Sequence, residues 1–312
     1  MHYEAPEHLI TFRDWPDSSV REVLDLALKV KRARHYYQGA MSGRTLVMLF
    51  QKTSTRTRVS FEAAMTEMGG HGIYLDWNSS NFKLSKIKYE TAYLSRNVAI
   101  IMARMKLHED LLELQTGASV PLINGCCNRY HPCQALADML TIYEDAGRVE
   151  GVRLAYLGVH NNVANSLMAV CAALGVHLTL VCPIAPESIV DLALKEKLQS
   201  RGLLRETLDA REAVSDADYV YTDTWVDMEF FNDPAYQHLK EERIQVMSPY
   251  QINRELMSHT KARILHDMPI HPGFEITEEM VEDDRALIFQ QAENRLEAQK
   301  AVIMYLLHGQ WY

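Results

Sequence analysis

A run of hydroxyl and guanidinium side chains follows a short apolar segment and opens a stretch with helical spacing. The N–H groups at a helix start, together with the helix dipole, favour a bound anion, and a guanidinium group offers a fork of donors that fits phosphate oxygens. We therefore predict a phosphate site here; the alternative is a well-capped helix with solvated arginines. The residues in question are Ser54, Thr55, Arg56 and Thr57. The glycines of a Walker A loop do not occur in this segment.

Two more segments place polar side chains after expected strands in the same half of the chain. Arg104 follows one strand, and His131 and Gln134 follow the next. Open parallel sheets bind their ligands at the carboxyl ends of strands, so we expect these side chains to converge with residues 54–57. For His131 alone, a histidine at a helix start bonded to backbone is the competing interpretation.

The elements that must position these side chains form an alternation of short apolar runs and amphipathic stretches. This alternation predicts an α/β fold with two parallel-sheet α/β domains joined by interdomain helices. We expect strands at 45–50, 72–75, 98–102, 120–123, 153–157, 176–181, 219–222 and 263–265, and helices at 20–36, 134–143, 163–174, 187–200 and 291–307.

A polar, glycine-bearing segment at 144–151 separates the two series of strands. We therefore expect one domain over residues 1–145, a second over 146–290, and a C-terminal helix over 291–312 that returns to the first domain.

Composition excludes several classes of protein. The chain has 312 residues with 32 basic and 41 acidic side chains, a net charge of −9, which argues against nucleic-acid binding. The first twenty residues contain no apolar run of signal-peptide type, and the most apolar stretch, 163–185, is interrupted by polar residues, so we expect no membrane span. Five cysteines without CxxC spacing suit a reducing compartment, and we predict a cytoplasmic protein.

Seven motifs, taken in order, resemble those of the aspartate/ornithine carbamoyltransferase family, and the order is closest to the ornithine branch. The resemblance covers nearly the whole chain. The motifs are STRTR at 54–58, Arg104, HPCQ at 131–134, the NN pair at 161–162, DTWVDM at 223–228, HDMP at 266–269 and AENR at 292–295.

The resemblance implies transfer of the carbamoyl group of carbamoyl phosphate to an amine of an ornithine-like substrate, with release of phosphate. It implies no metal, no organic cofactor and a homotrimer or a multiple of trimers. The first domain would bind carbamoyl phosphate and the second the amine. The implied donor-binding residues are Ser54, Thr55, Arg56, Thr57, Arg104, His131, Gln134, Met268 and Arg295; the amine-binding residues are Asn162, Asp223, Asp227 and Met228; the catalytic residues are Arg104, His131, Asp223, Asp267 and Arg295.

Three positions depart from the ornithine pattern by gaining a carboxylate. Ornithine enzymes usually carry Ser-Met-Gly where this chain has Asp-Met-Glu at 227–229, and His-Cys-Leu-Pro where it has His-Asp-Met-Pro at 266–269. Carboxylates gathered in one cleft repel one another unless they share a proton or meet a cation, and a substrate ammonium group would be that cation. Asp267 could also deprotonate the attacking amine.

These departures leave alternatives open. The acceptor could be a putrescine-like diamine or a specialised diamino acid. Asp227 and Glu229 could face solvent, and Asp267 could contribute mainly its backbone carbonyl. The chain could also be a catalytically inactive, transferase-like binding protein. A dinucleotide or metal site is not expected, because GxGxxG is absent and His266 and His271 lack ligand spacing.

Overall fold

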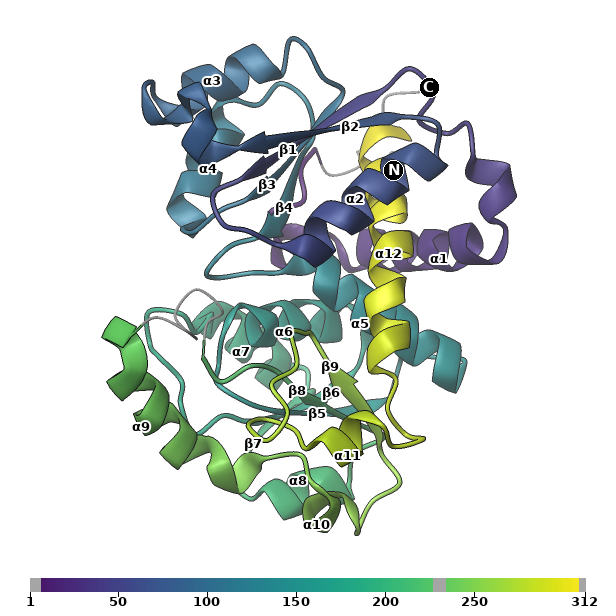
Figure 1. Cartoon of the computed structure of the whole chain (residues 1–312). Helices are drawn as coiled ribbons and strands as arrows, with labels where there is room; N and C mark the ends of the chain where they lie inside the picture. The colour runs from purple at the N-terminus through teal and green to yellow at the C-terminus, as the bar shows by residue number, and fades with distance from the viewer. Residues whose placement is uncertain (1–6, 227–233, 309–312) are drawn as a thin grey trace. The chain divides into compact units, whose positions relative to one another are not determined.

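The computed structural model describes residues 7–226 and 234–308 (Figure 1). Their contacts group residues 7–140 with 293–308 as a first unit and residues 141–226 with 234–292 as a second. Each unit contains one parallel β-sheet with helices. The expected fold class, two parallel-sheet α/β domains, is therefore confirmed.

The first unit has a four-stranded sheet in the order β2-β1-β3-β4. Strands β1, β3 and β4 are buried along nearly their whole length, as expected for parallel strands covered on both faces. Figure 1 shows α3 and α4 side by side. The elements are α1 (Asp17–Arg32), β1 (Thr45–Phe50), α2 (Thr55–Glu67), β2 (His71–Asp76), α3 (Ile87–Leu94), β3 (Ile100–Arg104), α4 (His108–Gly117), β4 (Leu122–Cys126), the start of α5 (Pro132–Ala146) and most of α12 (Ile288–His308).

The strand register of this unit brings the ends of β1, β3 and β4 to the same edge of the sheet. Phe50 at the end of β1 pairs with Arg104 at the end of β3, and Arg104 pairs with Cys126 at the end of β4. The segments that follow β1 and β4 carry Ser54 and His131, so both begin at the same edge of the sheet as Arg104.

The second unit has a five-stranded parallel sheet in the order β7-β6-β5-β8-β9. The chain runs outward from β5 in one direction and then returns to its other side with β8, so a topological switch point lies between β5 and β8. The elements are β5 (Arg153–Leu157), α6 (Asn162–Leu174), β6 (His177–Val181), α7 (Leu192–Ser200), β7 (Leu204–Glu206), α8 (Ala210–Ser215), β8 (Tyr219–Thr222), α9 (Gln237–Met247), α10 (Arg254–Met257), β9 (Arg263–His266) and α11 (Glu278–Val281).

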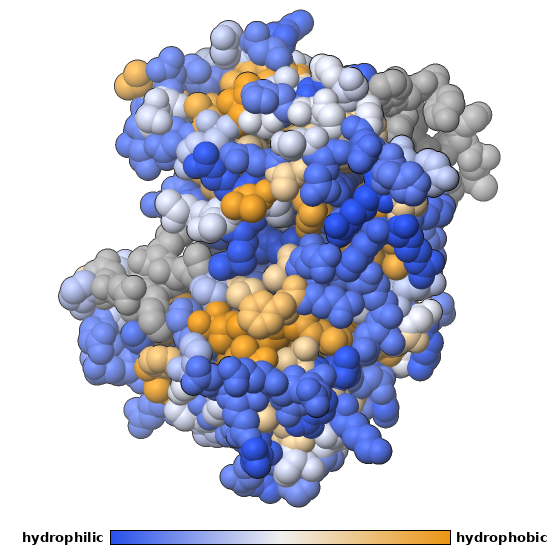
Figure 2. Space-filling view, turned by 45° about the vertical axis from the view of Figure 1, so that its right-hand side comes forward, coloured by the Kyte–Doolittle hydropathy of each residue, from blue (hydrophilic) through white to orange (hydrophobic). Residues whose placement is uncertain are grey.

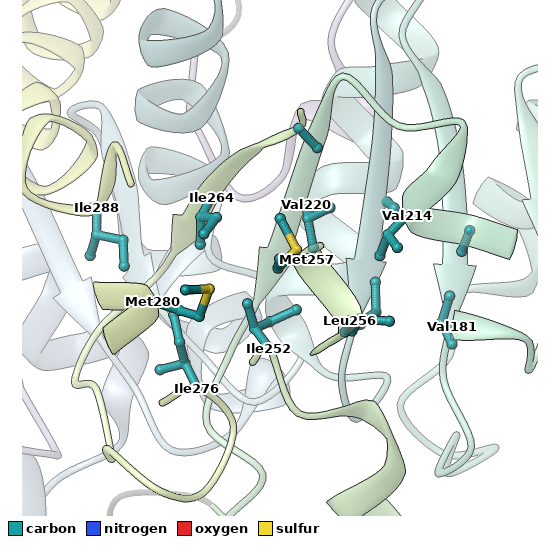
Figure 3. Close-up of a cluster of buried hydrophobic side chains, with 14 residues drawn as sticks. Val181, Val214, Val220, Ile252, Leu256, Met257, Ile264, Ile276, Met280 and Ile288 are labelled. Carbon is teal, nitrogen blue, oxygen red and sulfur yellow. The ribbon is translucent and has the colours of Figure 1, made fainter. Parts of the chain in front are cut away.

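A cluster of buried aliphatic side chains covers one face of this second sheet. Figure 3 shows Val220 and Ile264, which lie on β8 and β9, among side chains from α8, α10 and α11. Alternation along a strand places the neighbouring residues on the opposite face, where the rings of Tyr156 and Tyr221 lie 5.8 Å apart. The labelled members are Val181, Val214, Val220, Ile252, Leu256, Met257, Ile264, Ile276, Met280 and Ile288.

Several expectations about the elements were wrong in detail; for example, the helix expected at 187–200 begins only at Leu192. Strand β3 extends through Arg104, which was expected after the strand, because its ladder with β1 continues to Phe50. The helix expected at 20–36 starts at Asp17 and ends at Arg32, followed by a 3-10 turn at Arg34–Tyr37. Strand β7 was not expected, since three partly buried residues give too short a pattern to recognise.

On the face shown in Figure 2, hydrophilic residues predominate and apolar residues form separate patches. Among residues 7–226 and 234–308, none of the helices combines the length and apolar character needed to span a membrane.

Candidate active site

The segment at 54–57 forms the start of α2. Ser54 is the N-cap residue, and its Oγ accepts a hydrogen bond of 3.3 Å from the backbone N–H of Thr57. The Ser54 hydroxyl also donates to Thr57 Oγ1 over 3.1 Å. Thr55, Arg56 and Thr57 thus occupy the first helical turn, where the positive end of the helix dipole favours an anion.

Thr57 is the meeting point of three distant parts of the first unit. Its Oγ1 accepts hydrogen bonds from Arg104 Nη1 at 3.4 Å and from Arg295 Nη2 at 2.9 Å. All three residues are buried, although two of them carry a full charge. Two guanidinium groups held around one hydroxyl at a helix start form a strongly positive, desolvated spot that suits a phosphate-bearing ligand.

His131 lies within the field of this positive cluster. Burial lowers its pKa well below 6.5, and the charges of Arg295, Arg104, Lys52 and Arg56 lower it further. The imidazole is therefore neutral at pH 7 and offers one N–H donor and one acceptor.

Gln134 is buried in the first turn of α5, and its Nε2 donates to Asp138 Oδ1 over 2.8 Å. The expected donor residues that the structure links, by hydrogen bonds or by their effect on the pKa of His131, are Ser54, Arg56, Thr57, Arg104, His131 and Arg295. Sequence reasoning missed Lys52, which acts on His131, and Asp138, which bonds Gln134; an acid at i+4 from Gln134 was the available signal for Asp138.

A second group of polar side chains lies at the carboxyl end of the other sheet. Leu157, Thr222 and His266 are register partners at the ends of β5, β8 and β9. The residues that follow them include Asn161, Asp223 and Asp267, and this edge is the switch point where doubly wound sheets bind ligands.

Asn161 fixes the orientation of Asp223. Its Nδ2 donates to Asp223 Oδ2 over 2.7 Å, while its Oδ1 caps α6 by accepting from the backbone N–H groups of Val163 and Ala164. The backbone N–H of Thr224 donates to the other oxygen, Asp223 Oδ1, over 2.7 Å. The motif at 161–162 included both asparagines, but only Asn162, the first residue of α6, was assigned to amine binding; the position of Asn161 just before the helix was the signal for its capping role.

Asp223 is a buried acid that lies close enough to Asp267 to feel its charge. Burial raises the pKa of Asp223 well above 3.8, and the negative charge of Asp267 raises it further. Both carboxylates also act on Tyr156, whose pKa is raised by burial and then by Asp223, Cys182 and Asp267. Such a pair needs a shared proton or a cation, and a substrate ammonium group satisfies that requirement.

The remaining predicted site residues are Met268, Asp227 and Met228. Met268 follows β9 in the second unit, with a φ of 66° in the left-handed region. Asp227 and Met228, expected to bind the amine, lie outside the described residues, as does Glu229.

Two family models match this chain, one in its first half and one in its second half. Residues 7–144 match the model for the carbamoyl-P binding domain of aspartate/ornithine carbamoyltransferases, and residues 150–306 match the model for the Asp/Orn binding domain. The chain is 38% identical over 308 residues to the ornithine carbamoyltransferase of Archaeoglobus fulgidus, covering 96% of this chain and 97% of that protein.

Two further comparisons, one with a sequence and one with a solved structure, point to the same family. The chain is 40% identical over 306 residues to the ornithine carbamoyltransferase of Bacillus subtilis strain 168, covering 96% of this chain and 93% of that protein. The solved structure of ornithine carbamoyltransferase from Pyrococcus furiosus matches with a TM-score of 0.90 at 36% identity, covering 99% of each chain. The chain therefore belongs to the aspartate/ornithine carbamoyltransferase family.

Proposed function

We propose that this protein is an N-carbamoyltransferase that moves the carbamoyl group of carbamoyl phosphate to an amine of an ornithine-like acceptor and releases phosphate. The observation that carries the proposal is the meeting of Arg104 and Arg295 on Thr57, at a helix start, beside the neutral His131. Membership of the family and the printed names of the relatives support the same activity.

The donor half of the reaction needs positive charge and hydrogen-bond donors. As the amine attacks the carbonyl carbon, a C–N bond forms, the carbonyl oxygen becomes an oxyanion, and the C–O bond to phosphate then breaks. Preorganised donors aimed at that oxyanion stabilise the transition state, and cations around the phosphate neutralise the leaving group. We assign phosphate binding to Ser54, Thr55, Arg56 and Thr57, the bridge between phosphate and carbonyl oxygen to Arg104, and the carbamoyl end to His131, Gln134, Met268 and Arg295.

The acceptor half needs negative charge and a proton acceptor. A protonated amine must lose a proton before it can attack, and a carboxylate beside it can take that proton. We assign this role to Asp267, because it lies next to Asp223 at the strand ends and is less buried than Asp223. We assign acceptor binding to Asn162, Asp223, Asp227 and Met228.

The adjacency of Asp223 and Asp267 favours a second acceptor class, a putrescine-like diamine or a specialised diamino acid. Two carboxylates attract an additional cationic group and disfavour an acceptor carboxylate near them. Ornithine remains the first choice because the relatives similar over the whole chain are named for it.

An acceptor panel tests this function. Purified protein with carbamoyl phosphate and either ornithine, putrescine, 2,3-diaminopropionate, lysine or aspartate is followed for ureido product, and we expect ornithine to react fastest. If only aspartate reacts, the ornithine branch is wrong; if only putrescine reacts, the diamine takes its place. Calorimetry with carbamoyl phosphate alone identifies an inactive scaffold, which has no reason to bind the donor.

We further infer the organisation of the protein in the cell. Residues 1–145 form the carbamoyl-phosphate domain, residues 146–290 the amine domain, and 291–312 a C-terminal segment that returns to the first. We propose assembly as a homotrimer or a multiple of trimers in the cytoplasm, and exposed apolar side chains of the first unit, such as Val59, Leu84 and Tyr93, are available for a subunit interface. Light scattering during gel filtration should then give at least three times the chain mass of 35.8 kDa.

A further inference from the structure

Glu275 is a buried acid that the reaction described above does not use. It is 1% exposed and lies after β9, nine residues beyond His266. Its Oε1 atom accepts a hydrogen bond from His266 Nε2 at 3.0 Å and another from the backbone N–H of His271 at 2.6 Å. One carboxylate oxygen of Glu275 therefore bonds both His266 and His271, which lie on either side of Asp267 in the chain.

The first branch from Glu275 fixes the backbone around Asp267. His266 is fully buried, and its Nδ1 accepts a hydrogen bond of 2.8 Å from the backbone N–H of Met268. Because Nδ1 is an acceptor, the ring proton lies on Nε2 and is donated to Glu275. The backbone N–H of His266 is held in turn by Gln291 Oε1 at 2.8 Å. Asp267 thus lies between two residues whose backbone N–H groups are both bonded.

The second branch runs from Glu275 to Asp223. The Nδ1 atom of His271 lies 3.2 Å from Thr224 Oγ1. The Thr224 hydroxyl donates its only proton to the carbonyl of Val226 at 2.8 Å, so His271 Nδ1 must be the donor in that contact. The backbone N–H of Thr224 then donates to Asp223 Oδ1 at 2.7 Å. The loop after β8 is in this way joined to the loop after β9.

The charge on Glu275 is maintained by these donors. Burial alone would raise the pKa of Glu275, but the hydrogen bonds from His266 and His271 outweigh burial and lower the pKa to about 2. Its negative charge also contributes to raising the pKa of Asp223, after burial and Asp267. Because charge-assisted hydrogen bonds are short and strong, the ionised and buried Glu275 restricts the positions of both loops, the one after β8 and the one after β9.

We propose that Glu275 is a positioning residue for the amine acceptor, which holds Asp267 through His266 and Asp223 through His271 and Thr224. This inference rests on the proposed function, because it is the acceptor that contacts the two aspartates. Glu275 itself touches no reacting atom. Of the donor residues assigned above, only Met268 lies in this network, so the loss of Glu275 should change acceptor use far more than donor binding.

The test compares Glu275→Ala and Glu275→Gln in the full chain. We expect Glu275→Ala to lower kcat/KM for ornithine about 10- to 100-fold, mainly through KM, because small misplacements of binding groups have effects of that size. The glutamine variant keeps an oxygen that can accept both N–H groups, so it should recover most of that loss. Binding of carbamoyl phosphate, measured by calorimetry, should stay within about twofold. An unchanged acceptor KM in Glu275→Ala, or an equal loss of donor affinity, overturns the proposal.

Asp283→Asn is the matched control. Asp283 is also an acid of the second unit, and its pKa is lowered to about 2 by hydrogen bonds from Arg285, which lies 2.8 Å away. It does not belong to the network described above. The control should bind and carbamoylate ornithine within about twofold of the unaltered protein. A loss equal to that of Glu275→Ala would show a general effect of removing a buried or paired acid and would overturn a positioning role.

Thr224→Val tests the second branch with Glu275 left in place, and so decides the matter even if Glu275→Ala fails to fold. We expect a rise in acceptor KM that is smaller than that of Glu275→Ala, with carbamoyl phosphate binding unchanged within about twofold, because only one of the two branches is cut. An unchanged acceptor KM in Thr224→Val would overturn the link. The unaltered protein is assayed first; if it carbamoylates putrescine and not ornithine, the proposed acceptor has failed, and the variants are compared on putrescine.

Discussion

Arg295 Nη2 donates a hydrogen bond of 2.9 Å to Oγ1 of Thr57, a residue 238 positions earlier in the chain. Arg104 Nη1 reaches the same oxygen at 3.4 Å. Cations from β3 and α12 thus meet at the start of α2, and the proposed phosphate site draws on three segments far apart in the chain. A third cation, Arg56, lies in the first turn of α2 itself.

Arg56→Ala should lower kcat about 100- to 1,000-fold and strongly weaken carbamoyl phosphate binding, because a donor aimed at the phosphate is removed from a desolvated site. Arg58→Ala is the control on the same helix. Arg58 is exposed, bonds Glu62 at 2.9 Å and stacks over the Tyr74 ring at 4.0 Å. Steady-state rates and calorimetry measure both. Equal losses in the two variants would mean that Arg56 has no special place in donor binding.

His131 should remain neutral across the physiological pH range. Burial and the neighbouring arginines lower its pKa well below 6.5, whereas in the unfolded chain it takes up a proton near 6.5. The unfolded state therefore binds more protons as pH falls below that value, so the stability contributed by neutral His131 is present above pH 6.5 and is lost as pH drops. Histidine NMR titration, assigned with a His131→Asn variant, checks this. A His131 midpoint at 6.5 would contradict it.

Asp223→Asn should abolish acceptor use and remove a pH dependence of stability, although its NH2 group must face one of the two N–H donors that bond Asp223. The unfolded chain releases the Asp223 proton near pH 3.8, while burial and Asp267 keep the folded pKa well above that value. Protonated Asp223 therefore makes its full contribution to stability below pH 3.8, and this contribution is lost as pH rises through the pKa of Asp223 in the folded state. Asparagine has no proton to lose in this range, so it avoids that loss. Thermal unfolding at pH 4 and pH 8 gives the comparison.

The stability of Asp223→Asn relative to the unaltered protein should be higher at pH 8 than at pH 4. For a unit of this size, each kcal/mol corresponds to about 2–4 °C in Tm. If Asp223→Asn is equally destabilised at both pH values, ionised Asp223 does not lower the stability of the folded state.

Lys300→Ala should destabilise the first unit by about 3 kcal/mol, because it removes a partner from a buried carboxylate. Lys300 is 2% exposed and contacts Glu297, which is fully buried, at 3.3 Å, as well as Glu67 at 2.5 Å. Arg34 remains on Glu297 at 2.7 Å, which limits the loss. Urea unfolding measures the change, and the exposed ion pair lost in Arg58→Ala, worth less than about 1 kcal/mol, is the reference. Similar values for the two variants would rule out a strong buried pair.

The sequence by itself determined the secondary structure of the central strands and the identity of the chemical motifs. Strands 45–50, 153–157 and 219–222 were predicted at their observed bounds. Buried parallel strands are encoded locally, as continuous apolar runs, so no knowledge of neighbours is needed to find them. The same holds for the hydroxyl-rich helix start at Ser54, whose capping role depends only on the residues that follow it.

The tertiary structure alone decided which side chains meet and how they are charged. Nothing local indicates that Asn161 orients Asp223, that Arg295 reaches Thr57, or that Glu275 bonds His266. Those contacts follow from strand order and register, which depend on packing between segments far apart in the chain. The lowered pKa of His131 and the raised pKa of Asp223 likewise come from burial and from charges on distant segments, since desolvation exists only once the fold has formed.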